Sequence, residues 1–375
     1  MKRFIYADNA ATTKLNIEAF EAMKPYLLDE YGNASQPYSF ARKPKQALKE
    51  ARAIIARCIN ASPEEIFFTS GGTESDNWAI KGTACPTAKN NRVITSTIEH
   101  HAVLRACETV ARAGFPVTYL PVTREGIVPA DTLSECITDQ TGLVSVMMVN
   151  NEIGTIQPIK ELCAITHQYG ALFHTDCVQA MGHIPVDVKE LGVDMLSASA
   201  HKFNGPKGIG FLYIKNGTPI NSYADGGAQE FGMRAGTENV AAIVGMAVAL
   251  KRNCDEMVIN QEKIAILKQA FLDSLRNHGI NFIVNGEKNS VPNIISISIK
   301  CASGEALLHR LDLMGIAIST GSACDSVNDE LSHVIKAIKT DDEYAHGTIR
   351  ISFGKDNIVE EAIEIASAIA KIVKG

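Results

Sequence analysis

SASAHKFNGPKGIG, at residues 197–210, is the stretch around which the rest of the sequence is best understood. Its first residues form a short β-type run, and its glycines indicate a turn directly afterwards. Lys202 stands where the run gives way to the turn, next to His201. An amine at the end of a buried strand can hold an aldehyde as a Schiff base. Because most lysines are simply solvated on loops, the motif needs companions elsewhere in the chain.

Seven β-type runs between about residue 60 and residue 215 predict the main sheet. They alternate with helical stretches, and several are apolar on both faces, which indicates an α/β fold with a mostly parallel seven-stranded sheet. Ligands of such sheets bind at the carboxyl ends of the strands, so polar motifs that follow the runs are candidate site residues. The runs are EIFFTS (65–70), RVITST (92–97), FPVTYLP (115–121), LVSVMMVN (143–150), ALFHTD (171–176), DMLSASA (194–200) and GIGFLYI (208–214).

The rest of the chain predicts a second, smaller unit. Residues 263–279 and 358–375 carry apolar residues at helical spacing. Strand-like runs lie between them: NIISISI (293–299), GIAIST (315–320) and TIRISFG (348–354). We therefore expect a large α/β domain over residues 15–253 and a small α+β domain built from residues 1–14 and 254–375.

The composition is that of an ordinary globular protein. The 375 residues are 46% hydrophobic and 21% charged, and such usage predicts folded structure nearly end to end. The formal net charge of -6 comes without a basic cluster, so direct nucleic acid binding is not expected. The longest apolar run, at residues 240–250, is too short to span a membrane, and the first residues lack an apolar signal core. We expect a cytoplasmic protein.

The motif TSGGTESDN, at residues 69–77, directly follows a predicted strand. Gly71 and Gly72 allow a sharp turn, and Thr73 opens a helix whose free amides can hold a phosphate. The string matches neither the dinucleotide-binding fingerprint nor a Walker loop. A simple helix cap is an equally good interpretation of these residues.

The motif ALFHTDCVQA, at residues 171–180, places Asp176 at a strand end with Gln179 three residues on. A carboxylate there can keep a pyridine nitrogen protonated, which makes the ring an electron sink. Together with Lys202, this arrangement predicts pyridoxal 5'-phosphate as the cofactor. The alternative for Asp176 is again a helix cap.

His100, in the motif EHHAVL at residues 99–104, also follows a strand. Its imidazole can stack on a flat ring or move protons near neutral pH. A metal site is the competing interpretation. However, neighbouring histidines point in different directions and no further ligand cluster has suitable spacing, so no metal is expected. A capping histidine is the third possibility.

Asn151 and Arg350 are candidates for binding a substrate carboxylate. Asn151 follows the run that ends at residue 149, and Arg350 lies within an apolar strand, where its guanidinium needs an anionic partner. A structural salt bridge is the alternative for Arg350. Loop asparagines often do no more than stabilise turns.

Cys324 is the best nucleophile candidate among the nine cysteines. It lies in the small, flexible segment STGSACDS, at residues 319–326, where a thiol can reach a substrate and withdraw. An inert thiol in a polar turn is the alternative. The cysteines show no CxxC pair, which indicates reduced thiols without a structural zinc site. Thr237, before an apolar helix, belongs to another candidate anion site, which would serve its own pocket or that of a neighbouring subunit, and a flexible connector is the alternative.

Taken together, these motifs resemble the cysteine desulfurases, a group of class V pyridoxal phosphate enzymes of fold type I, over nearly the whole length. The GSAC context of Cys324 is similar to that of group I, the NifS/IscS type. The matching strings are YADNAATT (6–13), YGNAS (31–35), SGGTESDN (70–77), EHHAVL (99–104), VNNEIGTIQP (149–158), HTDCVQA (174–180), SAHKFNGPKGIG (199–210), MRAGTEN (233–239), STGSACDS (319–326) and RISFG (350–354).

The resemblance implies a role for each candidate residue. Lys202 would bind the cofactor covalently, Asp176 would pair with its ring nitrogen, and His100 would stack on its ring and assist proton transfer. Cys324 would accept the sulfur. The remaining implied contacts are the ring hydroxyl for Gln179, the cofactor phosphate for Gly72, Thr73, Ser199, His201 and the second subunit's Thr237, and the substrate carboxylate for Asn151 and Arg350.

The implied activity is a sulfur transfer in a homodimer. L-Cysteine would lose its sulfur to Cys324, leaving L-alanine and a persulfide for an acceptor protein, either an iron-sulfur scaffold or a thiolation enzyme. The segment GGAQEF, at residues 226–231, departs from the family pattern at Ala228 and Phe231 and has fewer cations. A selenocysteine lyase or an aminotransferase of the same class, or a sulfur-relay protein without catalysis, is the alternative.

Overall fold

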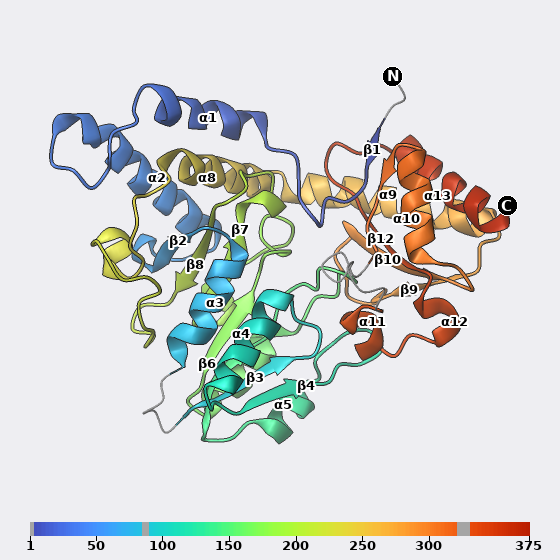
Figure 1. The fold of residues 1–375 in the computed structure, drawn as a ribbon, viewed down its shortest axis with the longest axis horizontal. Helices are drawn as coiled ribbons and strands as arrows, with labels where there is room; N and C mark the ends of the chain where they lie inside the picture. The colour runs from blue at the N-terminus through green and yellow to red at the C-terminus, as the bar shows by residue number, and fades with distance from the viewer. Residues whose placement is uncertain (1–3, 85–89, 321–330) are drawn as a thin grey trace.

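The computed structural model describes residues 4–84, 90–320 and 331–375 (Figure 1). Within these ranges, no helix is long and apolar enough to cross a membrane. The cysteines within these ranges are all free. The His, Cys, Asp and Glu side chains of the described residues form no cluster that could hold a metal ion. Cys324, the predicted sulfur acceptor, lies outside the described residues.

The larger part of the molecule is built on a seven-stranded sheet of order β2-β8-β7-β6-β5-β3-β4. All neighbouring strands are parallel except β8, which is antiparallel to both β2 and β7. β8 follows β7 after a turn too short for a crossover, so it must run back beside it. The predicted fold class is confirmed. The strands are β2 (Ile66–Thr69), β3 (Arg92–Ser96), β4 (Val117–Leu120), β5 (Thr141–Ser145), β6 (Leu172–Asp176), β7 (Met195–Ser199) and β8 (Gly210–Ile214).

Apolar residues cover both faces of this sheet, because successive strand residues point to opposite sides. Phe67 packs edge-on against Trp78 of α3 in one cluster, whereas Phe68 belongs to the larger cluster that includes Ile55 of α2 and Met246 of α8. The helices of this part are α1 (Ile17–Leu28), α2 (Arg42–Cys58), α3 (Gly72–Thr83), α4 (His101–Arg112), α5 (Ala130–Cys136), α6 (Ile159–Gln168), α7 (Val188–Leu191) and α8 (Val240–Asp255), with short 3-10 turns η1 (Ser39–Ala41), η2 (Pro63–Glu65), η3 (Ala200–Lys202) and η4 (Gln229–Gly232).

The smaller part contains a three-stranded antiparallel sheet of order β12-β10-β9 with an apolar cluster of its own. Its long helices α9 and α13 pack against each other (Figure 1). The elements are α9 (Met257–Asn277), β9 (Phe282–Asn285), β10 (Ile294–Ile299), α10 (Gly304–Leu313), β11 (Ile316–Ala317), α11 (His333–Ala337), α12 (Asp342–Ala345), β12 (Thr348–Ser352) and α13 (Val359–Lys374).

The N-terminal arm joins the two parts. Strand β1 (Ile5–Tyr6) pairs in parallel with β11. The strand predicted over residues 315–320 is therefore outside the three-stranded sheet, and at Ile316–Ala317 it is shorter than expected. Ile5 packs in the cluster of the smaller part, and Asp8 forms a bridge with Ser352. The chain then crosses to α1 and the larger part (Figure 1). The division into domains at residues 14/15 and 253/254 stays a prediction.

Candidate active site

A cavity of about 290 Å³ collects nearly all of the predicted site residues. Those that line it are Gly72, Thr73, His100, Asn151, Asp176, Gln179, Ser199, His201, Lys202 and Arg350. Two sets of residues form its wall. The sheet side consists of Gly72, Thr73, Asp76, His100, His101, Met147, Asn151, Glu152, Asp176, Val178, Gln179, Ser199, His201 and Lys202. The junction side consists of Ala10 and Ala11 of the N-terminal arm with His333 and Arg350.

Lys202 lies at the end of η3, directly after strand β7. Its Nζ donates hydrogen bonds to the carbonyl oxygens of Ala10 at 2.7 Å and Ala11 at 2.8 Å. The sheet side and the N-terminal arm therefore meet at this amine. The amine lines the cavity, as the sequence predicts.

Asp176 is the last residue of β6 and only 4% of it is exposed. Burial raises the pKa of its carboxyl group to about 6, against the opposing effects of the hydrogen bond from the Val178 amide and the charge of Lys202. The Val178 amide donates at 2.8 Å. Since this pKa lies below neutral pH, the group is mainly an anion there. Gln179 follows on the same turn, and its Nε2 donates to the carbonyl of Ala10 at 2.8 Å.

The N-terminus of α3 forms another part of the sheet side. The helix begins at Gly72, and Thr73 and Ser199 lie beside it on the cavity wall. A Cβ atom at Gly72 would lie 2.6 Å from Cγ2 of Val178, so the backbone approaches the wall as only glycine allows. His201 completes this end of the cavity. Burial lowers the pKa of its imidazole to about 4, with smaller effects from nearby lysines.

His100 both caps a helix and lines the cavity. Its Nδ1 accepts a hydrogen bond from the Ala102 amide at 3.1 Å at the start of α4. Burial lowers the pKa of the imidazole to about 4, and the charge of Lys202 adds to this effect. The ring is therefore neutral at physiological pH, with Nε2 as its remaining polar atom. The capping interpretation is correct for this residue, and it leaves the ring available to a ligand.

Arg350 connects the two sides of the cavity. It lies in β12 and is 3% exposed. Its Nη1 donates to the carbonyl of Asn151 at 2.7 Å, and its Nη2 pairs with the Asp8 carboxylate at 2.8 Å. The predicted alternative, a structural salt bridge, is thus present. The third nitrogen, Nε, is buried without a hydrogen-bond partner among the described residues, and the guanidinium, with five N–H groups, keeps donors for an anion.

Both ends of the segment that contains Cys324 are attached to cavity residues. Before it, the backbone of Ser319 exchanges two hydrogen bonds with Arg350, at 3.1 and 2.7 Å. After it, the Ser332 hydroxyl donates to the buried Glu152 carboxylate at 2.5 Å. His333 then hydrogen-bonds the carbonyl of Glu99 at 3.0 Å.

Thr237 is exposed and does not line this cavity within one chain. It lines a separate cavity of about 190 Å³ together with Ser70, Arg234 and Glu238. Its expected contact with the cofactor of a second subunit stays a prediction.

Sequence reasoning missed three polar residues that complete the site. Asp76 follows Gly72 by one helical turn on α3 and lines the cavity, and this spacing is a signal that could have identified it. Asp8 pairs with Arg350 from the opposite end of the chain, and His333 follows no strand. Neither residue carries a local signal of its role.

Comparison with known proteins identifies the family. The aminotransferase class V model matches residues 5–364. The chain belongs to this family. Membership confirms the predicted resemblance and fold type, and it makes the protein a pyridoxal phosphate enzyme, as predicted.

Its relatives within the class V family include cysteine desulfurases. Cysteine desulfurase IscS of Dictyoglomus turgidum is 48% identical over 376 residues, which cover 100% of this chain and 95% of that protein. A solved NifS-like protein has a TM-score of 0.94 at 36% identity, with 99% of this chain and 100% of that chain covered. The structure of SspA in complex with cysteine has a TM-score of 0.84 at 34% identity, covering 94% and 100% of the two chains.

The cavity fits the cofactor of this class V enzyme. Pyridoxal phosphate needs an amine, an acid beside its ring nitrogen and amide donors for its phosphate. The cavity presents Lys202, the buried Asp176 and the close-packed Gly72 turn at the start of α3. Each group comes from a different strand end of the same sheet.

Proposed function

We propose that this cavity is where the protein acts as a cysteine desulfurase, removing sulfur from L-cysteine and releasing L-alanine. The observation that carries the proposal is the convergence of Lys202, Asp176 and the start of α3 on one cavity, which Arg350 also lines. The names of the relatives, and the cysteine complex among the similar structures, support the same substrate.

The cofactor is held by the residues of the sheet side. Pyridoxal phosphate supplies an aldehyde for covalent attachment and a ring that withdraws electrons from the substrate's α-carbon. Asp176, as an anion, pairs with the ring nitrogen and keeps it protonated. Gly72, Thr73, Ser199 and His201 bind the phosphate at the α3 N-terminus. His100 stacks on the ring through its neutral imidazole, and Gln179 contacts the ring hydroxyl.

Lys202 is the proton carrier of the site. Its amine donates to the carbonyls of Ala10 and Ala11 and would hold the cofactor covalently until the substrate replaces it. The free amine then removes the α-proton of L-cysteine, and a base positioned in this way contributes about 10²- to 10⁴-fold to a rate.

The substrate carboxylate binds at the junction of the two sides. Arg350 lines the cavity, and Asn151 lies beside it with its carbonyl already bonded to the guanidinium. A guanidinium with two donors already fixed is held rigidly, which orients the substrate at little cost in side-chain entropy.

Cys324 receives the sulfur. The residue lies four positions beyond Thr320, so its Cα is at most about 14 Å from that of Thr320. A chain of this length is long enough to bring the thiol to the cavity from Ser319, which is bonded to Arg350. The Cys324 thiolate attacks the sulfur of the substrate and forms an S–S bond, while the C–S bond breaks and its electron pair goes to carbon. That carbon takes up a proton, Lys202 returns the α-proton to the α-carbon, and L-alanine leaves.

The persulfide passes to an acceptor protein by thiol exchange, either an iron-sulfur scaffold or an enzyme of thiolation. We also propose a homodimer, in which Thr237 completes the phosphate site of the partner. Exposed apolar side chains near α1 support such an interface, since large exposed patches mark contact surfaces; they are Ile17, Phe20, Leu27, Leu28, Tyr31, Tyr38 and Phe40. The free described cysteines support a cytoplasmic location.

Measurement of both products from L-cysteine tests the proposal. Wild type and Cys324→Ser are compared for alanine and sulfide release with a dithiol reductant present. We expect both products to fall together, by at least about 100-fold. Cys301→Ser, which removes an exposed cysteine away from the cavity, is the matched control. Undiminished turnover in Cys324→Ser would favour an aminotransferase, and a wild type that acts only on selenocysteine would favour a lyase.

A further inference from the structure

Asp76 is a buried carboxyl group that the proposed reaction does not use. It lies on α3, is 1% exposed and lines the cavity. Its Oδ1 is buried without a hydrogen-bond partner among the described residues, and the nearest ring nitrogen, Nε2 of His174, is 3.7 Å away. A buried anion with so little compensation is strongly unfavourable.

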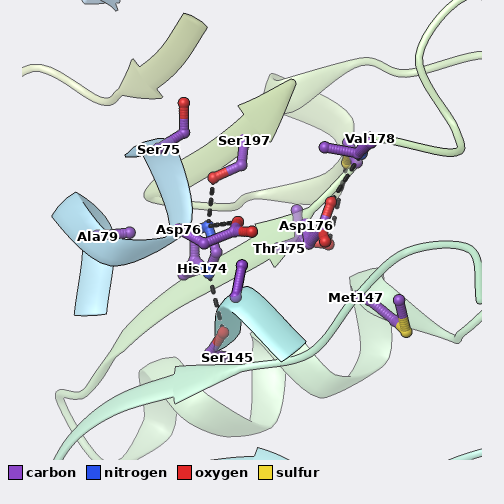
Figure 2. A network of polar contacts seen from close by, with 12 residues as sticks. Ser75, Asp76, Ala79, Ser145, Met147, His174, Thr175, Asp176, Val178 and Ser197 are labelled. Atoms are coloured by element: carbon purple, nitrogen blue, oxygen red, sulfur yellow. Dashed lines mark hydrogen bonds and ion pairs between the residues drawn. The ribbon is translucent and has the colours of Figure 1, made fainter. Parts of the chain in front are cut away.

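His174 and the two serine hydroxyls beside it, the groups on one side of Asp76, are neutral. In the network of Figure 2, the His174 ring lies between the hydroxyls of Ser145 and Ser197, each 2.9 Å from one ring nitrogen. Burial lowers the pKa of this imidazole to about 3, so it carries no charge to balance Asp76. The hydrogen bond from Ser197 lowers the pKa of the Asp76 carboxyl group, but by less than burial raises it.

The other titratable groups that act on Asp76 are carboxyls, and burial raises the pKa of one of them, Glu99, to about 8, so that it is mainly protonated at neutral pH. Asp176 faces it from the end of β6 and Glu99 from the segment after β3, and both raise the pKa of Asp76 after the larger effect of burial. Lys202 acts on Asp176, whose pKa it lowers. Two carboxyl groups that share a buried site do not both ionise. The proton therefore resides on Asp76. The negative charge resides on Asp176, which lies near the Lys202 cation and accepts a hydrogen bond from the Val178 amide.

We propose that Asp76 is a positioning residue of the cofactor site, held as a neutral carboxylic acid so that Asp176 remains the anion that faces the ring nitrogen. This inference rests on the proposed role of Asp176. Its protonated carboxyl group would leave a hydroxyl donor on the cavity wall, beside the anion whose charge state it sets.

The proton on Asp76 can be measured without the cofactor, through the stability of the protein. A carboxyl group whose pKa is raised in the folded state binds its proton more tightly there than in the unfolded chain. Stability is therefore lost as the pH rises from about 4 toward the folded pKa. Asp76→Asn removes this loss. We expect the melting temperature of cofactor-free Asp76→Asn, relative to wild type, to shift upward as the pH rises above about 5.

A packing role would give a different result, namely an offset in melting temperature that does not change with pH. That result would overturn the proposal. As a measurement that does not depend on the Asn variant folding, infrared spectra of the cofactor-free wild type and of Glu99→Gln should both show a protonated carboxyl band at neutral pH. Loss of the band in Glu99→Gln would assign it to Glu99 and would also overturn the proposal.

The same substitution at the two neighbouring carboxyls separates this inference from the proposed function. Asp76→Asn mimics a neutral acid and should retain desulfurase activity to within about threefold. Asp176→Asn removes the anion and should lower activity by at least about 100-fold. Full activity in Asp176→Asn would refute the proposed role of Asp176. A large loss in a folded Asp76→Asn, with Asp176→Asn inactive as expected, would refute only the inference about Asp76.

Discussion

The two sides of the cavity are built in different ways. The residues of the sheet side follow the strand ends of one sheet or the turns beside them, so a single folding unit places them. The junction side brings together residues from the two ends of the chain, since Asp8 and Arg350 are 342 positions apart. We propose that the sheet side carries the chemistry of the cofactor, whereas the junction side binds the substrate carboxylate.

Lys202→Ala, on the sheet side, should have the largest effect. Without the amine, the cofactor has no covalent anchor and the substrate has no base, so we expect desulfurase activity to fall by about 10²- to 10⁴-fold. The visible absorbance of the bound cofactor should shift or disappear. Lys207→Ala, which alters the neighbouring lysine of the same turn outside the cavity, is the control for both measurements. A Lys202→Ala enzyme that retained wild-type turnover would disprove the role of the sheet side.

Arg350→Lys should change substrate binding more than chemistry. A lysine cannot reproduce the three directed donors of the guanidinium, so the loss of one charged hydrogen bond should cost about 1.5–3 kcal/mol. This corresponds to a rise in KM for L-cysteine of about 10- to 150-fold with a much smaller change in kcat. Steady-state kinetics distinguish the two constants. If kcat fell and KM stayed constant, Arg350 would act in the chemical step and not in substrate binding.

The charge of Asp176 predicts how cofactor affinity depends on pH. The group must be an anion to pair with the ring nitrogen, and its pKa in the cofactor-free protein is raised to about 6 by burial. Above this pH the anion is present, and below it protonation should reduce cofactor affinity by about tenfold per pH unit. Equilibrium titrations of wild type and Asp176→Asn give the comparison, since the variant should lack this dependence. Equal slopes for both proteins would show that another group titrates.

Ser332→Ala should have the smallest effect. It removes the hydroxyl that donates to the Glu152 carboxylate and accepts from the Val334 amide at the start of α11, and the loss of these two buried hydrogen bonds should lower the free energy of unfolding by about 1–3 kcal/mol. Denaturant unfolding measures this change. Ser367→Ala, on the exposed face of α13, should leave the free energy of unfolding nearly unchanged. A change in cofactor affinity without a change in stability would mean that Glu152 acts on the sheet side directly.

The sequence predicted the sheet side well for a physical reason. Asp176, His100 and Lys202 each follow an apolar run within a few residues, and parallel strands bring their carboxyl ends to the same edge. Arg350 could also be identified, because a charged residue in an apolar strand needs a partner. That partner, Asp8, could not be found, since only the complete tertiary fold brings the N-terminal arm beside β12.

Two further differences have local causes. The antiparallel direction of β8 depends on the short connection after Lys202. The apolar runs predict where the strands lie but not in which direction each one runs. Asp76 remained unnoticed because an acid in the first turns of a helix is usually explained by the helix dipole. Its function depends on burial, which the spacing from Gly72 only suggests.

The pairing of Asp8 with Arg350 has a consequence for how the protein is made. Residues near the beginning of the chain leave the ribosome first, yet their partners in β12 are among the last to be synthesised. A nascent polypeptide can form the large sheet, but it cannot complete the substrate pocket until translation has nearly finished. The vitamin-derived cofactor can thus be captured before the amino acid substrate finds a complete binding site.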